Sequence, residues 1–447
     1  MSMNYTRLLQ AARPSQPDGD LLRASEQDRA RVVQSAPVRR LQQKTQVFPL
    51  DVKASVRSRL THSLEVQQVS RQLSLALLQQ APHLQPWMMP WLNLLEMAAL
   101  LHDVGNPPFG HFGESVIREW LHQHLDSYFQ VAVSTDPSLR WQQQLRPDLL
   151  AFDGNAQSLR LVHSLQQLDL TCSLLASLIK VPRGIDEGLR GSEGPGFFCS
   201  ERGLIHQLRS TLGLMPGVRM PLVYLLEVAD DLCYCIADLE DAVDRGLLAQ
   251  TTLVQQLRAT DVDPDYLQPL LDAACHSGEG FFAVFRQRLT DDVIAVAVTT
   301  YLENEAAILN GQFNTTLLDE QAPAVALLSR LRRLAREQIF RSREIEALEL
   351  EGCAAICGVL DRYGRLLMLS RSEFTRLLTE GTGSALLQRL VRRLSRRHID
   401  AYHRALAESD TDADEWEWYL RVRLLIDYVS GMTDTYVQAE YRLLLGC

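Results

Sequence analysis

The stretch LHDVGNPPFGHFGE, residues 101–114, places a histidine beside an aspartate and follows them with a loop rich in glycine and proline. Neighbouring side chains in a helix interior diverge by about 100°, so His102 and Asp103 cannot face one point there. At a helix end that unwinds into Gly-Asn-Pro-Pro, both side chains can turn toward the same place. The stretch therefore predicts two metal-type ligands at the end of a helix.

The rest of the chain is predicted to be helical almost throughout. Leu, Ala, Gln, Glu and Arg dominate, and apolar residues recur at spacings of three and four, as in Leu387, Leu390, Val391 and Leu394. We expect an all-α fold with at most a short β-ribbon, near residues 194–203 (GPGFFCSERG). The loop-like breaks are too short to separate independent domains, so residues 1–447 are predicted to form one helical body.

The composition of the chain argues against a membrane protein, a secreted protein and a cysteine-ligated zinc protein. The chain of 447 residues has 45 basic and 55 acidic side chains, a net charge of −10, and 46% hydrophobic residues, enough for a large core. No stretch of about 20 apolar residues is present, and residues 1–20 lack the apolar segment of a signal peptide. We expect a cytoplasmic protein with no membrane partner. The eight cysteines form no CxxC pair, which favours buried thiols over a zinc site.

Metal-type ligands also occur in two other stretches. Residues 57–66 contain His62, and residues 227–241 contain several aspartates on one amphipathic helix. A ligand set of two imidazoles and two carboxylates, with room for water, favours Mn, Fe, Co or Zn over Mg. A single histidine is more often an ordinary core residue. The combination is what indicates a metal site.

At this point the sequence resembles a known family. The pattern H…HD…D is the signature of the HD superfamily of metal-dependent phosphohydrolases. The longer strings HDVGNPPFGHFGE, FDGNAQSLR, EVADDLCYCIADLEDAV and YVSGMTDTYVQAEYR resemble the deoxyguanosine triphosphate triphosphohydrolases, or dGTPases. The resemblance runs from about residue 39 to 442. It implies an HD catalytic core at approximately 39–245 and a C-terminal helical region at approximately 246–447.

The resemblance implies the metal ligands His62, His102, Asp103 and Asp230, holding a divalent ion such as Mn, Mg, Fe, Co or Zn. Asp230 is followed at i+4 and i+8 by Tyr234 and Asp238, so the three share one helix face. In the family this face lines the nucleotide site, with the tyrosine near phosphate and ribose and the aspartate accepting from the 3′-hydroxyl. Without the neighbouring aspartates, Tyr234 would be interpreted as a core tyrosine.

His111 and Glu114 are the catalytic pair that the resemblance implies. Water would attack the α-phosphorus of a dNTP, with dGTP the expected substrate, and release deoxynucleoside and intact triphosphate. A protonated His111 beside the leaving 5′-oxygen suits a general acid, and a carboxylate nearby raises its pKa. The alternative is that Glu114 only begins the next helix, where acids are favoured.

Other substrate contacts follow from the same resemblance. Asn155 and Lys180 match positions near sugar and phosphate, and Gln46 and Val47 match a segment near the base and the 3′ side of the sugar. The family usually has tyrosine after this lysine, whereas Val181 follows here. That departure puts one contact, and some substrate selectivity, in doubt.

Five arginines, at positions 389, 392, 393, 396 and 397, follow a helical spacing on one predicted face. By similarity to the family, Arg389 would reach the triphosphate, in its own or a neighbouring subunit's site, and the chain would form a homo-oligomer. The same arginines could also bind single-stranded DNA, although the negative net charge of the chain disfavours wrapping of duplex DNA. A solvated face is the alternative.

Two other functions compete with the dGTPase. Another HD-type nucleotidase or phosphodiesterase would share only the metal residues, and the strings FDGNAQ and DLEDAV argue against it. The third hypothesis is a nucleic-acid-responsive binding protein with a regulatory HD site. The presence of all the candidate metal ligands and of the candidate catalytic pair argues against it. No GxxxxGK[ST] loop is present, so phosphates must be handled by the metal and by basic side chains.

Overall fold

The computed structural model describes residues 4–16, 19–50, 53, 55–133, 135–189, 194–408 and 414–445. Within these ranges the chain is helical and contains no strand, so the all-α prediction is confirmed; Thr45 and Ser58 form an isolated antiparallel bridge. The β-ribbon considered near residues 194–203 does not form, because a 3-10 turn and α10 occupy much of that segment. In the described chain no helix has the length and apolar character of a membrane span.

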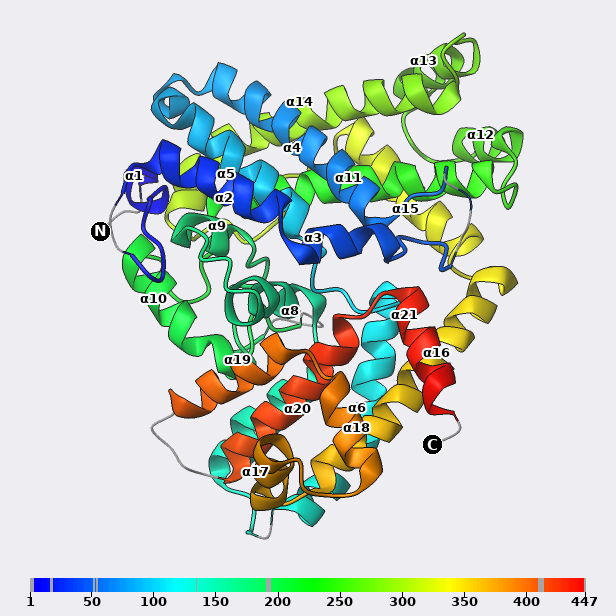
Figure 1. The fold of residues 1–447 in the computed structure, drawn as a ribbon. Helices are drawn as coiled ribbons and strands as arrows, with labels where there is room; N and C mark the ends of the chain where they lie inside the picture. Colours follow the sequence, from blue (N-terminus) through cyan, green and yellow to red (C-terminus); the bar gives the residue numbers. More distant parts are fainter. Residues whose placement is uncertain are drawn as a thin grey trace.

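One group of helices packs around a first hydrophobic core and fills the upper half of Figure 1 and its left side. These helices are α1 (Tyr5–Leu8), α2 (Leu21–Val33), α3 (Ala36–Arg40), α4 (Arg59–Gln80), α5 (Met88–Leu101), α9 (Cys172–Ser177), α10 (Arg202–Leu212), α11 (Pro221–Asp244), α12 (Gln250–Arg258), α13 (Pro264–Cys275), α14 (Phe281–Leu309) and α15 (Pro323–Gln338). Helices α4, α5 and α11 pack against one another at its centre. They carry the predicted metal ligands.

A second core lies below the first in Figure 1. Its helices are α6 (Gly110–Ala132), α7 (Arg146–Leu150), α8 (Gly154–Arg160), α16 (Arg343–Gly364), α17 (Arg371–Glu380), α18 (Ala385–Arg393), α19 (Arg396–Ala407), α20 (Asp414–Ser430) and α21 (Asp434–Leu444). Short 3-10 or π turns are η1 (Leu41–Gln43), η2 (Pro82–Trp87), η3 (Trp141–Leu145), η4 (Leu161–Leu165), η5 (Cys199–Glu201) and η6 (Arg365–Met368). Each core takes residues from both sides of position 245. The predicted division near that residue stays a prediction.

Local sequence sets the helix ends that surround the site. Ser58 accepts a hydrogen bond from the backbone of Thr61, whose hydroxyl bonds back to Ser58, and this capping box begins α4. Helix α6 begins after Phe109, a non-glycine residue in the left-handed region with φ 61°. The backbone N–H of Phe109 donates to Asp434 Oδ1 at 3.0 Å, and this hydrogen bond holds the turn in place. The junction between α5 and α6 is therefore fixed from a distant part of the chain.

The arginines at 389–397 do not share one helix. Leu394 is extended, with ψ 143°, and Ser395 is the N-cap of a new helix, so α18 and α19 separate the set. Arg393 forms an ion pair with the buried Glu440. The prediction of a single arginine face was wrong because spacing alone does not reveal the short break at Leu394 and Ser395.

A buried ion network ties α8 to α20 and makes the first testable prediction. Arg160 donates to Asp427 Oδ2 at 2.7 Å and to Glu201 Oε1 at 2.8 Å, with all three side chains nearly inaccessible. We expect Asp427→Asn to lower the free energy of unfolding by about 3–5 kcal/mol, because it leaves buried charge uncompensated. Urea denaturation measures this. The exposed pair of Asp126 with Arg146 provides the control, since Asp126→Asn should cost about 1 kcal/mol or less.

Candidate metal centre and active site

Four predicted ligands from three helices converge on one point. His62 lies in the first turn of α4, His102 and Asp103 directly follow α5, and Asp230 lies in the middle of α11. Ligand atoms of His62, His102 and Asp103 lie within 4.8 Å of one another. Asp230 Oδ1 lies 3.2 Å from His62 Nε2 and 3.4 Å from His102 Nε2. Two imidazoles and two carboxylates thus surround a space that could hold a metal ion.

The orientation of His102 fits a metal ligand. Its Nδ1 lies 2.7 Å from the carbonyl oxygen of Ala99, an acceptor that places the ring proton on Nδ1. Its Nε2 therefore keeps a free lone pair, and in the described chain this buried atom has no hydrogen-bond partner. A buried unpartnered nitrogen is costly unless a ligand satisfies it, so the residues present fit a metal ion.

Neighbouring cations keep both aspartates ionised. Burial would raise the pKa of Asp230, but Lys180, which donates to its Oδ2 at 2.9 Å, holds that pKa well below its usual range. Burial also opposes ionisation of Asp103, but its ion pair with Arg59 outweighs this and lowers the pKa. Both carboxylates are therefore available as anionic ligands.

The next residue, Asp231, faces away from the cluster of metal ligands and toward Arg332. Its Oδ2 pairs with Arg332 at 2.9 Å, and the guanidinium of Arg332 lies over the ring of Tyr234, 5.5 Å from its centroid. Consecutive helix residues point about 100° apart, so only one of the two aspartates can face α4 and α5. The structure brings Asp230, the residue that the family resemblance implied, to the cluster.

The predicted catalytic pair is assembled at the start of α6. His111 Nδ1 lies 3.1 Å from Glu114 Oε2, and the other carboxylate oxygen of Glu114 accepts from the N–H of Gly154 at 2.9 Å. The imidazole is 84% exposed, whereas the carboxylate is buried. The hydrogen bond that His111 donates to the Glu114 carboxylate raises the pKa of His111. The arrangement presents a fixed, readily protonated imidazole to solvent.

Comparison with known proteins identifies the relatives. The HD domain family model matches residues 59–134, which include three of the four converging residues. The chain is 36% identical to a deoxyguanosinetriphosphate triphosphohydrolase of Enterobacter sp. (strain 638), covering 99% of this chain and 98% of the relative. It is 37% identical to one of Serratia proteamaculans (strain 568), over 96% and 94%. It is 39% identical to a probable one of Pseudomonas aeruginosa, over 95% and 93%.

The chain belongs to the deoxyguanosinetriphosphate triphosphohydrolase family. Identity at this level over nearly the full length of each relative confirms the resemblance that the sequence motifs indicated. The HD match also identifies the helical core around α4 and α5 as that of metal-dependent phosphohydrolases.

In this dGTPase-family chain, the predicted nucleotide face of α11 carries an unusual carboxyl group. Asp238 is 2% exposed, and its Oδ1 has no partner among the described residues. Burial, with a smaller contribution from Asp241, raises the pKa of Asp238 well above its ordinary value. Tyr234 is half-buried one turn earlier. A polar group that entered beside α11 would satisfy Asp238.

The other predicted contacts lie in different surroundings. Lys180 is bonded to Asp230, and Asn155, in the first turn of α8, donates to Asp153 at 3.1 Å. Gln46 has a buried side-chain oxygen with no partner among the described residues, and Val47 is buried beside it in the chain. Their roles toward substrate stay predictions.

Within one chain, Arg389 does not lie at the cluster of metal ligands. It is exposed on α18 and donates to the carbonyl of Ala385 at 2.9 Å in its own helix. Helix α18 lies in the lower part of Figure 1, whereas α4 and α11 lie in the upper part.

Sequence reasoning missed the residues that position the ligands. Arg59, three residues before His62, pairs with Asp103, and Asn106 donates to the other oxygen of Asp103 at 2.7 Å. Asp434 accepts from the N–H of Thr45 at 2.9 Å as well as from the turn before α6. Arg59 could have been found from its i, i+3 spacing to His62. Asp434 lies in a string that carried the resemblance, but no local pattern points to its partners.

A tight approach at Gly154 gives a second prediction. A Cβ there would lie 2.1 Å from Asn106 Oδ1 and 2.5 Å from Glu114 Oε1. We expect Gly154→Ala to displace both side chains and to lower kcat/KM by about 10²-fold, the effect of a misplacement of about 1 Å. Gly203→Ala is the control, because a Cβ there meets nothing within 4 Å. Equal activity of the two variants in a triphosphate-release assay would contradict the argument.

Proposed function

We infer that this chain is an enzyme that hydrolyses dGTP to deoxyguanosine and inorganic triphosphate at the cluster formed by His62, His102, Asp103 and Asp230. The observation that carries the inference is the convergence of these four side chains in a chain of the dGTPase family. The pair of His111 and Glu114 lies on the helix that follows two of them, and supports chemistry at the same place.

The metal would be held by the two imidazoles and the two carboxylates. A divalent ion bound there supplies Lewis-acid polarisation of the α-phosphate and lowers the pKa of an attacking water. The mixed nitrogen and oxygen set favours Mn or another transition metal, such as Fe, Co or Zn, over Mg. Arg59 and Lys180 keep the carboxylates anionic and in place.

Proton transfer is assigned to His111. Its Nε2 would donate to the leaving 5′-oxygen as the bond to the α-phosphorus breaks, while Glu114 holds the ring through Nδ1. Gly154 holds Glu114 in turn. The reaction thus needs an imidazole that stays protonated near neutral pH, and the raised pKa of His111 supports this role.

Substrate selection is assigned to the face of α11 and to the segments near it. The 3′-hydroxyl would donate to Asp238, whose unpartnered oxygen supports this contact, and Tyr234 would pack against the sugar where a 2′-hydroxyl would be crowded. Lys180 and Asn155 would contact phosphate and sugar, and Gln46 and Val47 the base side of the nucleoside. Guanine preference would arise from a few such contacts, each worth about 1–3 kcal/mol.

The decisive experiment is a panel of the four dNTPs and GTP, with Mn or Mg, in which both products are identified by chromatography. We expect deoxyguanosine and intact triphosphate from dGTP, with GTP a poor substrate. Release of pyrophosphate or of a monophosphate would move the enzyme to another class of HD hydrolase.

We also propose that the protein is cytoplasmic and forms a homo-oligomer. In this oligomer Arg389 would contact the triphosphate bound at the site of a neighbouring subunit. The arginines near Arg389 would be accessible to single-stranded DNA. The exposure of Arg389 away from the metal helices supports this. Mixing inactive Arg389→Ala and His111→Gln subunits tests it. Activity should return in mixed oligomers, because one site then has both residues, and no recovery would assign Arg389 to its own subunit.

A further inference from the structure

A cavity of about 930 Å³ lies between α3, the start of α19 and the start of α21. Its size is within the range of small-molecule sites, about 300–1,000 Å³. It is lined by three arginines, Arg39, Arg40 and Arg397, and no aspartate or glutamate is among its lining residues. The wall therefore carries a net positive charge.

The three guanidinium groups have only neutral partners among the described residues. Arg40 donates to the carbonyl of Gly431 at 2.9 Å, Arg397 to the side chain of Gln166 at 2.6 Å, and Arg39 to the carbonyl of Gln34. Burial, followed by the nearby charges of Arg397 and Arg39, lowers the pKa of Arg40. Like charges held this close repel one another, and a bound anion would relieve the repulsion.

Two further features point to a ligand. His398 is 5% exposed and lines the cavity, and its Nδ1 has no hydrogen-bond partner in the described chain. Ser395, the N-cap of α19, also lines the cavity, and its hydroxyl does not cap the helix. The N–H of His398 donates to the carbonyl of Ser395 at 3.0 Å, so the two N–H groups before it at the start of this 12-residue helix are the ones without a side-chain cap, and the end of a helix with free N–H groups favours an anion.

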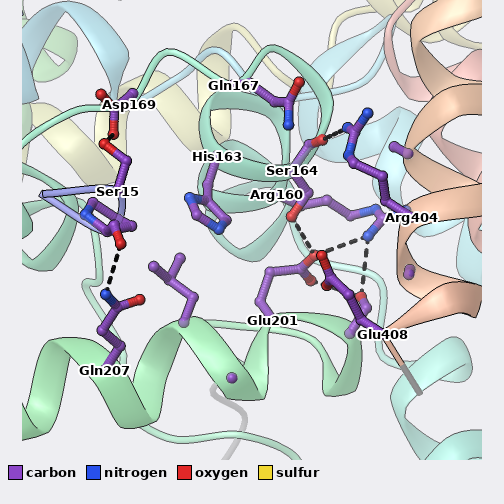
Figure 2. Close-up of a pocket in the computed structure, with 16 residues that line it drawn as sticks. Ser15, Arg160, His163, Ser164, Gln167, Asp169, Glu201, Gln207, Arg404 and Glu408 are labelled. Atoms are coloured by element: carbon purple, nitrogen blue, oxygen red, sulfur yellow. Dashed lines mark hydrogen bonds and ion pairs between the residues drawn. The ribbon is translucent and has the colours of Figure 1, made fainter.

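The contrast with another cavity shows that this is not a general property of the surface. Figure 2 shows a pocket in which several polar side chains already have partners among the residues that line it. There Arg160 pairs with Glu201 at 2.8 Å, Ser15 donates to Asp169 at 2.7 Å, and Arg404 donates to the carbonyl of Ser164 at 2.9 Å. That pocket contains both signs of charge and an ion pair between two of its lining residues, Arg160 and Glu201, whereas the arginine cavity has one sign only.

We propose that the arginine cavity binds a polyphosphate group, separately from the metal centre. Guanidinium groups bind phosphate oxygens through paired charge-assisted hydrogen bonds, and three of them suit a ligand with several phosphates. The group could belong to free polyphosphate or to a nucleoside triphosphate. Tyr436, 45% exposed on the cavity wall, offers a surface on which a base could stack. The proposal does not depend on the reaction inferred above.

The test is calorimetric titration of the full chain with inorganic tripolyphosphate, with a chelator present so that any binding at the metal centre is the same in all variants. Arg39→Gln and Arg397→Gln should each weaken binding about tenfold, and together about 100-fold, as expected for loss of charge-assisted hydrogen bonds. Arg396→Gln is the matched control. Its side chain is 85% exposed, pairs with Asp400 at 3.1 Å, and does not line the cavity.

Unchanged binding in the double variant would overturn the proposal, and the single variants decide the question if the double variant unfolds. A non-hydrolysable nucleoside triphosphate forms the second arm of the titration. Tighter binding of this analogue than of tripolyphosphate would assign the cavity to a nucleotide, and equal binding would assign it to free polyphosphate. If only an oligothymidylate bound, the cavity would be a nucleic-acid surface and the proposal would be wrong.

Discussion

Asp230→Asn is expected to lower dGTP hydrolysis by about 10³-fold or more and to reduce the bound metal per chain. The substitution replaces an anionic ligand by a weakly binding amide and leaves Lys180 without its charged partner. Loss of about 4 kcal/mol of transition-state stabilisation corresponds to this factor, and metal ions supply several kcal/mol in such reactions. Triphosphate release and metal analysis of the purified protein measure the two effects.

The neighbouring residue provides the control for this prediction. Asp231→Asn makes the same chemical change one position along α11, but Asp231 pairs with Arg332 and faces away from the cluster. It should retain its metal and most of its activity. Full activity in Asp230→Asn, or equal loss in both variants, would refute the assignment of the metal centre.

His111→Gln is expected to lower kcat by about 10²–10⁴-fold, the contribution typical of a general acid, without loss of bound metal. The side chain is largely exposed, so its removal should leave folding intact. His122→Gln, an exposed histidine on the same helix, should have no effect. A His111→Gln enzyme with unchanged kcat would exclude this histidine from proton transfer.

Glu114→Gln should change the dependence of the rate on pH. The hydrogen bond that His111 donates to Glu114 raises the pKa of His111, so the acid form persists to higher pH in the natural enzyme. Without the carboxylate the pKa falls, the imidazole loses its proton at lower pH, and the alkaline limb of kcat/KM should move to lower pH. A pH–rate profile of both enzymes measures the shift. An unmoved alkaline limb would show that another group sets it.

Several features of the site were predictable because they depend on neighbours in the chain. The His-Asp pair before a Gly/Pro loop, the i, i+3 spacing of His111 and Glu114, and the helical spacing of Asp230 and Asp238 are all properties of one or two turns. The break at Leu394 shows the limit of such patterns. Apolar and basic residues continue in register across it, although the backbone ends one helix and begins another.

The sequence by itself determined the helical class, the types of ligand and the helical stretches that carry them, since backbone hydrogen bonds and side-chain periodicity act over a few residues. The tertiary structure alone decided that Arg59 compensates Asp103 and that Asp434 holds both Thr45 and the turn before α6. These contacts join parts of the chain up to 389 residues apart. They depend on how helices pack around two buried cores, which no local pattern encodes.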